Sequence, residues 1–418
     1  MAILVQKYGG SSVADVAKIG KVADKVVAAR RAGHDVVVVV SAMGKTTDEL
    51  VALARRAAAT GSAPDLAASA STFDPPRREL DMLVSTGERV SMALLSIACH
   101  ARGFDAISFT GSQSGIITND RHFDARIIEV RPHRIEDELA RGKIVIVAGY
   151  QGMSYRREIT TLGRGGSDTT AVALAAALGA ERCEIYSDVD GVYSADPRVV
   201  TDPVHLPVID LATLQEMAEA GAKVLNAQAV EWARRAKITL HARRTSDPLD
   251  SARKPPRETI AAEAVTPSLH GQHASVRAVV GLDKVVHAKL RASDLRAFGD
   301  LAAELNVPLL DVCAFEDRAT ALVPLLNVPD WQRCCACIDE KLRGAVAFEE
   351  GRALVSVVGD GLTTSARALP RMLGILDEIG ATPSAVHAGP LRVSALIASD
   401  KLGEAQRALH AAFVAAAG

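Results

Sequence analysis

The hydrophobic positions in the first half of the chain follow two alternating patterns. Short runs of consecutive apolar residues, such as DVVVVVSAMG at residues 35–44, predict buried strands. Between them, as at residues 13–31 and 80–103, apolar residues recur every three or four positions, which predicts helices. Strands buried on both faces and separated by helices predict an α/β fold with a mostly parallel sheet. The predicted strands are residues 3–6, 35–44, 106–111, 143–149 and 183–191.

Segments rich in Gly, Ser and Thr follow the predicted strands. Ligands of open α/β sheets bind outside the carboxyl ends of the strands. We therefore expect the functional site along that edge. The segments are residues 9–12, 41–47, 110–118, 149–152 and 187–193.

A glycine-rich loop precedes one predicted helix. Residues 163–166 read GRGG, and glycine allows a backbone to approach a ligand closely. The spacing does not fit G-x-x-x-x-G-K-[ST], because no lysine follows. It does not fit G-x-G-x-x-G either, because Asp168 stands where the third glycine is needed. Neither familiar phosphate-binding loop is present.

The helix after this loop is predicted over residues 171–178, with Ser167 or Asp168 as its N-cap and Gly179 at its end. The free amides at a helix start attract anions. The loop is therefore interpreted as a cradle for a phosphate or a carboxylate. A purely structural turn is the alternative.

Composition narrows the class of protein. The chain has 418 residues, which favours two or three domains, and its 48 basic and 50 acidic side chains argue against a nucleic-acid partner. The start, MAILVQKYGG, does not resemble a signal peptide, and no apolar run is expected to span a membrane, so a cytoplasmic location is expected. The six cysteines predict reduced thiols and no metal site, because CCAC at residues 334–337 has no second cluster or histidine pair.

The sequence changes in texture from about residue 245. A segment rich in Pro and charge reads as a linker. Beyond it, two stretches of about 70 residues share a strand–helix–strand pattern, as tandem βαββαβ modules do. Such modules are commonly ligand-sensing units; a plain dimerisation domain is the alternative.

Five motifs together resemble those of aspartate kinases in the amino acid kinase superfamily. The resemblance covers residues 1–250 closely and the C-terminal half more loosely. It implies an open αβα sandwich followed by two ACT-like domains, with expected boundaries at 1–247 (catalytic), 248–270 (linker), 271–345 and 346–418. The motifs are KYGGSSV (7–13), VSAMGKTTDEL (40–50), LDMLVSTGERVS (80–91), the run from Ile159 to Val200, and MAEAGAKVLNAQAVEWA (217–233).

The resemblance implies phosphoryl transfer from ATP to the β-carboxylate of L-aspartate, giving 4-phospho-L-aspartate. That reaction needs two anions held together and the charge on the moving group neutralised. Lys7 would steady the phosphoryl group. Asp168 would organise Lys7 or the metal, or simply cap its helix. The ATP-binding residues implied are Lys7, Gly9 and Gly10 with exposed amides, Ser41, Ser187, Asp188, Tyr193, Arg198 and Lys223.

The acceptor has an α-carboxylate, an α-ammonium and the reacting β-carboxylate. Arg164 presents a planar fork suited to the α-carboxylate, and Glu88 supplies the anion that the ammonium requires. The remaining acceptor residues implied are Gly165, Gly166 and Ser167, which line the pocket, and Thr46 or Thr47 from a flexible loop, GKTTDEL, that closes over it.

The resemblance also implies partners and regulation. Mg²⁺ is expected to arrive with ATP, held mainly by phosphates and water. A homodimer or larger homo-oligomer is expected to form through the ACT-like domains.

The enzyme would catalyse the first step towards lysine, threonine and methionine. One alternative is the same chemistry on an aspartate analogue in a specialised pathway, and another is a silent subunit that binds an effector. The C-terminal modules lack the family's Pro-Gly pair at the first strand-to-helix turn, which predicts weak feedback inhibition.

Overall fold

The computed structural model describes residues 2–59, 75–222, 225–247, 257–263, 275–364 and 367–415. The Ala- and Ser-rich stretch at residues 60–74, Lys223 and most of the expected linker lie outside these ranges. The chain forms two compact units. Unit 1 comprises Met1–Val192, Pro207–Leu211 and Leu225–Val265, and unit 2 comprises Tyr193–Leu206, Ala212–Val224 and Thr266–Gly418.

Unit 1 is built on an eight-stranded sheet in the order β12-β14-β13-β9-β1-β2-β6-β3. Every pair is parallel except β13 with β14, which confirms the prediction of a mostly parallel sheet. The strands are β1 (Ile3–Tyr8), β2 (Asp35–Val40), β3 (Ala106–Phe109), β6 (Ile144–Ala148), β9 (Arg182–Ser187), β12 (Val208–Asp210), β13 (Leu240–Arg244) and β14 (Glu258–Ala262).

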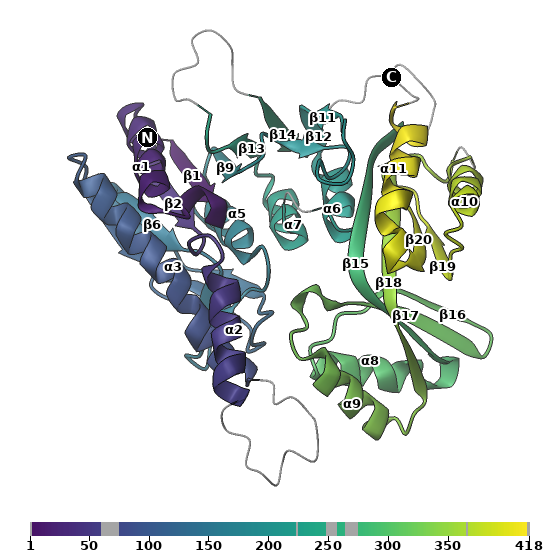
Figure 1. Ribbon diagram of the computed structural model, residues 1–418. Helices are drawn as coiled ribbons and strands as arrows, with labels where there is room; N and C mark the ends of the chain where they lie inside the picture. Colours follow the sequence, from purple (N-terminus) through teal and green to yellow (C-terminus); the bar gives the residue numbers. More distant parts are fainter. Residues whose placement is uncertain are drawn as a thin grey trace. The chain divides into compact units, whose positions relative to one another are not determined.

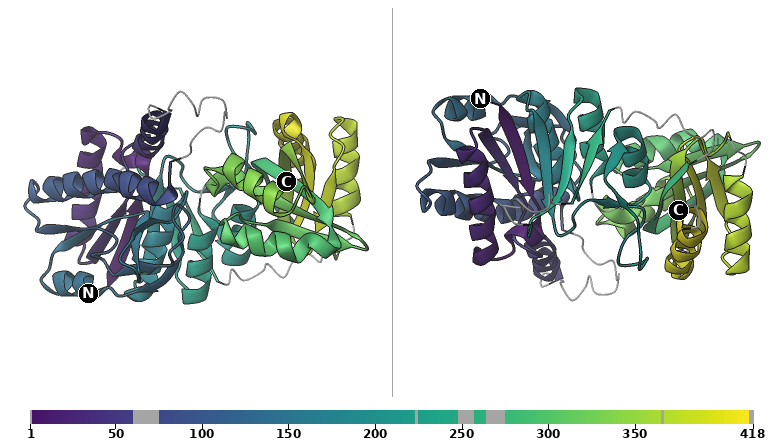
Figure 2. Two further views of the ribbon diagram at one scale, coloured as in Figure 1. Left: turned by 90° about the horizontal axis from the view of Figure 1, so that it is seen from below. Right: turned by 90° about the horizontal axis from the view of Figure 1, so that it is seen from above.

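Helices cover both faces of this sheet (Figures 1 and 2). On one face, α1 (Val16–Arg31) and α3 (Arg77–His100) enclose an apolar core with alternate valines of β2. On the other face, α5 (Gly166–Ala177) and α7 (Ala227–Ala236) pack together, and α5 also contacts β1, β2 and β9. The small alanine side chains of α5 let it lie close to the sheet. The other helices of unit 1 are α2 (Thr46–Ala59) and α4 (His133–Ala140).

A second, four-stranded sheet has the order β5-β4-β7-β8. Its last strand in sequence, β8 (Ile159–Thr161), contacts α3 and leads directly into the glycine-rich loop. The other strands are β4 (Ile116–Thr118), β5 (Ile127–Val130) and β7 (Gln151–Ser154).

Helix α3 is long and apolar enough, by length and composition alone, to cross a membrane. This departs from the expectation that no segment would reach that length. The helix is a core element of unit 1, however, because it packs on α1, β3, β6 and β8. Its buried positions include the polar residues Asp81, Ser85, Glu88 and Ser91, which a lipid-facing helix would not present.

Unit 2 contains a six-stranded sheet in the order β16-β17-β15-β18-β20-β19. Its two central strands, β15 (Ser275–Arg291) and β18 (Val346–Asp360), pair antiparallel along their whole length. The remaining strands are β16 (Leu310–Phe315), β17 (Arg318–Pro324), β19 (Ala385–Ala388) and β20 (Arg392–Ala398); the helices are α8 (Leu295–Glu304), α9 (Trp331–Lys341), α10 (Ala368–Glu378) and α11 (Leu402–Phe413).

The two expected modules share these central strands. Val279, in the first half of β15, lies in the apolar core formed with α10 and α11. Ala288 and Leu290, in the second half, lie in the core formed with α8 and α9. The first half of β15 therefore completes the module that is later in sequence. The shorter elements of the chain are α6 (Leu211–Glu219), β10 (Val192–Tyr193), β11 (His205–Leu206) and the 3-10 helices Gly10–Val13, Ala292–Asp294, Leu325–Asn327 and Ser399–Lys401.

Candidate active site

The predicted site segments of unit 1 meet at one edge of the main sheet. Strands β6, β2, β1 and β9 are neighbours and parallel, so their carboxyl ends lie side by side. Gly149 follows β6, Ser41 follows β2, Gly9 follows β1, and Ser187 ends β9. Four of the five Gly-, Ser- and Thr-rich segments therefore begin at this edge, as expected, and the fifth, residues 110–118, runs from the end of β3 into β4 of the second sheet.

Lys7 and Asp168 form a buried ion pair at this edge. Lys7 Nζ lies 2.7 Å from Asp168 Oδ1, and about nine tenths of each residue is buried. Asp168 comes from the first turn of α5, whose N-cap is Gly165 in a left-handed conformation with no side-chain cap bond. The expected capping by Ser167 or Asp168 is therefore wrong, because the helix begins at Gly166. The Asp168 carboxylate instead holds the lysine ammonium.

The loops after β1 and β2 lie against each other. A Cβ atom on Gly10 would be 2.9 Å from the Ala42 carbonyl oxygen, so only glycine permits this approach. The Gly44 amide donates to the Gly10 carbonyl at 3.0 Å. The Gly9 amide, expected to be exposed, donates to the Tyr186 carbonyl at 3.1 Å and is buried. Gly9 therefore shapes the loop and does not offer a free donor.

Glu88 is buried on α3 and only half satisfied. Its Oε1 accepts a hydrogen bond from the Ala42 amide at 3.0 Å, while Oε2 has no hydrogen-bond partner among the described residues. Burial raises the pKa of Glu88 to about 7, against the lowering effect of its backbone hydrogen bonds. A buried carboxylate in this state gains most from a cation placed beside it.

Arg164 is exposed and held from two sides. Its Nη2 lies 3.0 Å from Oδ1 of Asp48, in the first turn of α2, and its carbonyl accepts a hydrogen bond from Asn226 Nδ2 at 2.7 Å. Gly165 has φ +78°, and a Cβ there would be 2.7 Å from Asn226 Nδ2. Sequence reasoning missed Asn226, although it lies within the quoted motif at residues 217–233.

The segment GKTTDEL is not the flexible loop that the family resemblance implied. Helix α2 starts at Thr46, whose hydroxyl donates to the Met43 carbonyl at 2.6 Å. Thr47 lies in the same first turn. The acidic residues that follow favour a helix N-terminus electrostatically. This ordered turn presents Asp48 to Arg164.

Tyr150 was also missed as part of the site. It has φ +68°, a conformation that side-chain-bearing residues seldom adopt, and it lies directly beside Gly166. Ser167 packs against Gly149, where a Cβ would be 2.8 Å from the serine hydroxyl. The sequence signal for Tyr150 was its position immediately after Gly149 at the end of β6.

The residues expected to bind the nucleotide do not all lie at this edge of the sheet. The Ser187 hydroxyl and the Val189 backbone lie 3.2 Å apart, and Asp188 is exposed. Tyr193 and Arg198 belong to unit 2, where Arg198 bonds Asp196 through two nitrogens. Lys223 lies outside the described residues. The residues expected to bind the nucleotide are therefore divided between the two units, whereas Lys7, Glu88, Arg164 and Asp168 all belong to unit 1.

The chain is similar to known proteins over nearly its whole length. Residues 2–243 match the model of the amino acid kinase family. The chain belongs to this family. It is 40% identical to the aspartokinases of Mycolicibacterium smegmatis, over 421 residues, and Corynebacterium glutamicum, over 422; each alignment covers 99% of this chain and 96% of the relative.

A solved structure also matches over nearly the whole chain. It is E. coli aspartokinase III in complex with aspartate and ADP, with a TM-score of 0.81, 25% identity, and coverage of 98% of this chain and 99% of that one. The match supports the predicted fold: an amino acid kinase fold followed by further sheet structure at the C-terminus.

Proposed function

We propose that the protein transfers the γ-phosphoryl group of ATP to the β-carboxylate of L-aspartate, giving 4-phospho-L-aspartate. The enzyme is an ATP-dependent aspartate kinase. The observation that carries the choice of acceptor is Glu88: a buried, half-partnered carboxylate calls for a cationic group, and an α-ammonium supplies one. The full-length similarity to aspartokinases supports the same reaction.

Each residue of the proposed site has a role in the transfer. Lys7, held by Asp168, neutralises charge that develops on the transferred phosphoryl group. Arg164 exchanges its exposed ion pair with Asp48 for the α-carboxylate of aspartate, at little cost because exposed pairs are weak. Glu88 receives the ammonium. The acceptor subsite is completed by Gly165, Gly166, Ser167, Thr46 and Thr47. The nucleotide is bound by Gly10, Ser41, Ser187, Asp188, Tyr193, Arg198 and Lys223.

Mg²⁺ would enter with the nucleotide. The described residues contain no group of three or more His, Cys, Asp or Glu side chains that could hold a metal ion. Mg²⁺ is commonly bound by substrate phosphates, water and one or two carboxylates. Asp168, beside Lys7, is the carboxylate placed to contribute.

The proposal also covers the C-terminal modules, the assembly and the pathway. We assign residues 271–418 to two ACT-like modules that assemble a cytoplasmic homodimer or larger homo-oligomer. The sequence places their division at residues 345 and 346, but the first half of β15 joins the later module. The step would open the route to lysine, threonine and methionine.

An ADP-release assay with ATP and Mg²⁺ tests the function. Aspartate should support turnover, and glutamate should support at least tenfold less, since one extra methylene typically costs roughly 10- to 200-fold. Turnover of neither substrate would favour a silent effector-binding subunit. Turnover of an aspartate analogue in preference to aspartate would favour a specialised pathway.

A further inference from the structure

A fully buried carboxylate lies on the same helix as Glu88. Asp81 precedes Glu88 by seven residues, or about two turns of α3, so both side chains project from one face. Asp81 is 0% exposed. Burial raises its pKa to about 6, while hydrogen bonds from Thr161, His122 and the Phe123 amide act in the opposite direction. A charge buried this deeply persists only when it is well bonded.

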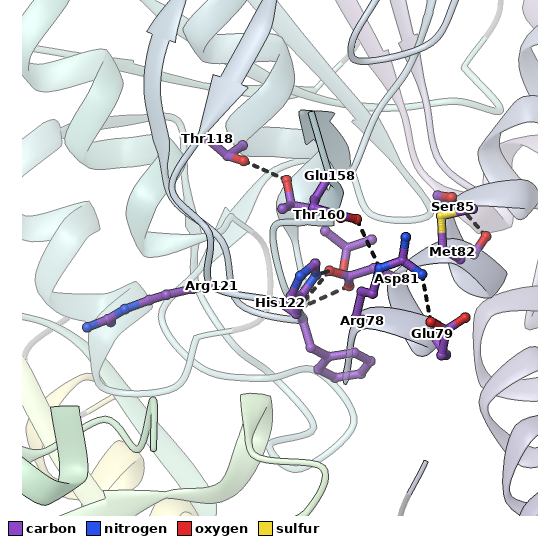
Figure 3. Close-up of polar contacts among 12 residues, drawn as sticks. Arg78, Glu79, Asp81, Met82, Ser85, Thr118, Arg121, His122, Glu158 and Thr160 are labelled. Carbon is purple, nitrogen blue, oxygen red and sulfur yellow. Dashed lines mark hydrogen bonds and ion pairs between the residues drawn. The ribbon is translucent and has the colours of Figure 1, made fainter. Parts of the chain in front are cut away.

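Asp81 is bonded by two other parts of unit 1 (Figure 3). The Thr161 hydroxyl, at the end of β8, donates to Oδ1 at 2.5 Å. The Phe123 amide donates to Oδ1 at 3.0 Å, and His122 Nδ1 lies 2.6 Å from Oδ2. The carboxylate therefore joins α3 to β8 and to the segment between β4 and β5.

That segment is itself fixed to β8. The Ala125 amide donates to the Thr161 carbonyl at 2.8 Å. Phe123 has φ +70°, a left-handed conformation that a bulky residue rarely adopts without support from its surroundings. The bond from its amide to Asp81 is part of that support. The arrangement is a built feature of the fold and not a chance surface contact.

The two main elements joined by Asp81 carry the two ends of the acceptor subsite. Helix α3 carries Glu88, and β8 runs directly into the loop that carries Arg164. Tyr150 is bonded beside the end of β8, where its carbonyl accepts a hydrogen bond from the Leu162 amide at 2.9 Å. Burial raises its pKa, a hydrogen bond with Thr161 lowers it, and the charges of Glu88 and Asp81 raise it further. Asp81 therefore shares a helix with Glu88 and is bonded, through Thr161, to the strand that leads to Arg164.

We propose that Asp81 is a positioning residue for the acceptor subsite. By holding Thr161 and His122, it fixes the separation of Glu88 from Arg164, and so favours a four-carbon amino dicarboxylate over the five-carbon one. This role rests on the proposed function, because Glu88 and Arg164 are assigned to aspartate there.

The sharpest test removes one hydroxyl. Thr161→Val keeps the branched shape and deletes the donor to Asp81, and Thr161→Ser restores it. The matched control is Thr160→Val, in the adjacent position of the same strand: its buried hydroxyl lies 2.6 Å from that of Thr118 and does not reach Asp81 (Figure 3). Thr160→Val deletes one buried hydrogen bond from β8, whereas Thr161→Val deletes the bond to Asp81 and also the bond with Tyr150.

Steady-state kinetics separate positioning from general damage. In Thr161→Val, KM for aspartate should rise about tenfold with KM for ATP within about twofold, and the aspartate-to-glutamate ratio of kcat/KM should fall; the tenfold change is about 1.4 kcal/mol. Thr161→Ser and Thr160→Val should both resemble the wild type. Equal effects of the two valine substitutions, or equal changes in both KM values, would overturn the proposal.

Calorimetric titration measures the affinity for aspartate without turnover. It is done with the wild type, Thr161→Val, Thr161→Ser and Thr160→Val. A wild type that binds aspartate but releases no ADP contradicts the proposed function alone. Unchanged aspartate affinity in Thr161→Val contradicts the positioning role alone. If Thr161→Val fails to fold, Asp81→Asn offers the same comparison, because it keeps the size of the side chain and loses an acceptor for the three donors.

Discussion

Glu88 in unit 1 and the turn after β18 in unit 2 differ in how their polar groups are bonded. In unit 1, Glu88 is buried with one carboxylate oxygen lacking a hydrogen-bond partner among the described residues. In unit 2, the end of β18 and the turn after it are bonded to the turn between β19 and β20: the Gly359 amide donates to the Leu391 carbonyl and the Leu362 amide to the Pro390 carbonyl. Polar groups held without partners cost stability and are retained where a ligand completes them. Unit 2 also holds such groups, since neither ring nitrogen of the buried His287 has a hydrogen-bond partner among the described residues. The contrast is therefore between Glu88 and this one turn, and not between the two units as a whole.

The largest effect is expected from Lys7. Replacing Lys7 with Ala should lower kcat by roughly 100-fold or more, because the ammonium acts mainly on charge that develops in the transition state. KM for aspartate should change little. Initial-rate measurements at saturating ATP decide this, with Lys18→Ala, an exposed lysine on α1, as the control. Near-normal turnover would remove Lys7 from the mechanism.

Arg164 tests the acceptor end of the same region. Arg164→Lys keeps the charge but loses the planar fork, so KM for aspartate should rise roughly 30-fold, about 2 kcal/mol, with KM for ATP nearly unchanged. Asp48→Asn is the matched control, since it breaks the exposed ion pair and leaves the guanidinium intact; its effect should stay within about twofold. Equal changes in both KM values for Arg164→Lys would contradict the assignment to the α-carboxylate.

Glu88 gives the region a pH dependence. The pKa of Glu88 is raised to about 7, so the free enzyme holds a proton there below that pH and loses it above. Only the ionised carboxylate pairs with an ammonium. The kcat/KM for aspartate should therefore fall about tenfold between pH 8 and pH 6. Glu88→Gln should lower kcat/KM at pH 8 and flatten the profile; an unchanged slope would show that another group titrates.

The sequence predicted the parts of unit 1 that depend on local pattern. The valine run of β2 and the glycines after each strand were sufficient to place the edge that carries Lys7 and Ser41. The start of α5 was misplaced because Gly165 takes a left-handed φ that outweighs the capping preference of Ser167. Asp81 gave no signal of its own, since its partners are 41 and 80 residues away in sequence.

Unit 2 was harder to predict for a related reason. The register of β15 shifts between Leu282 and Val285, where Lys284 has φ +55°, yet the strand continues and serves both modules. A sequence pattern records which face of a strand is apolar. It does not record which distant strand will pair with it, and here the partner, β18, is some 70 residues away.

The smallest effect is expected from feedback inhibitors. Recognition of an amino acid by the turn after β18 would need free backbone donors, but the amides of Gly359, Leu362 and Thr364 already donate within unit 2, and Pro390 has no amide hydrogen. Each hydrogen bond that a ligand cannot form costs about 1–3 kcal/mol, which is roughly one to two orders of magnitude in affinity. Lysine or threonine at about 5 mM should therefore change the rate by less than roughly twofold.

Two measurements decide this: activity assays with both amino acids and with leucine as the control, and calorimetric titration of the whole protein. Clear inhibition at millimolar or lower concentration would show that unit 2 retains an effector site elsewhere, and specific binding of another metabolite would show that the site has been rebuilt.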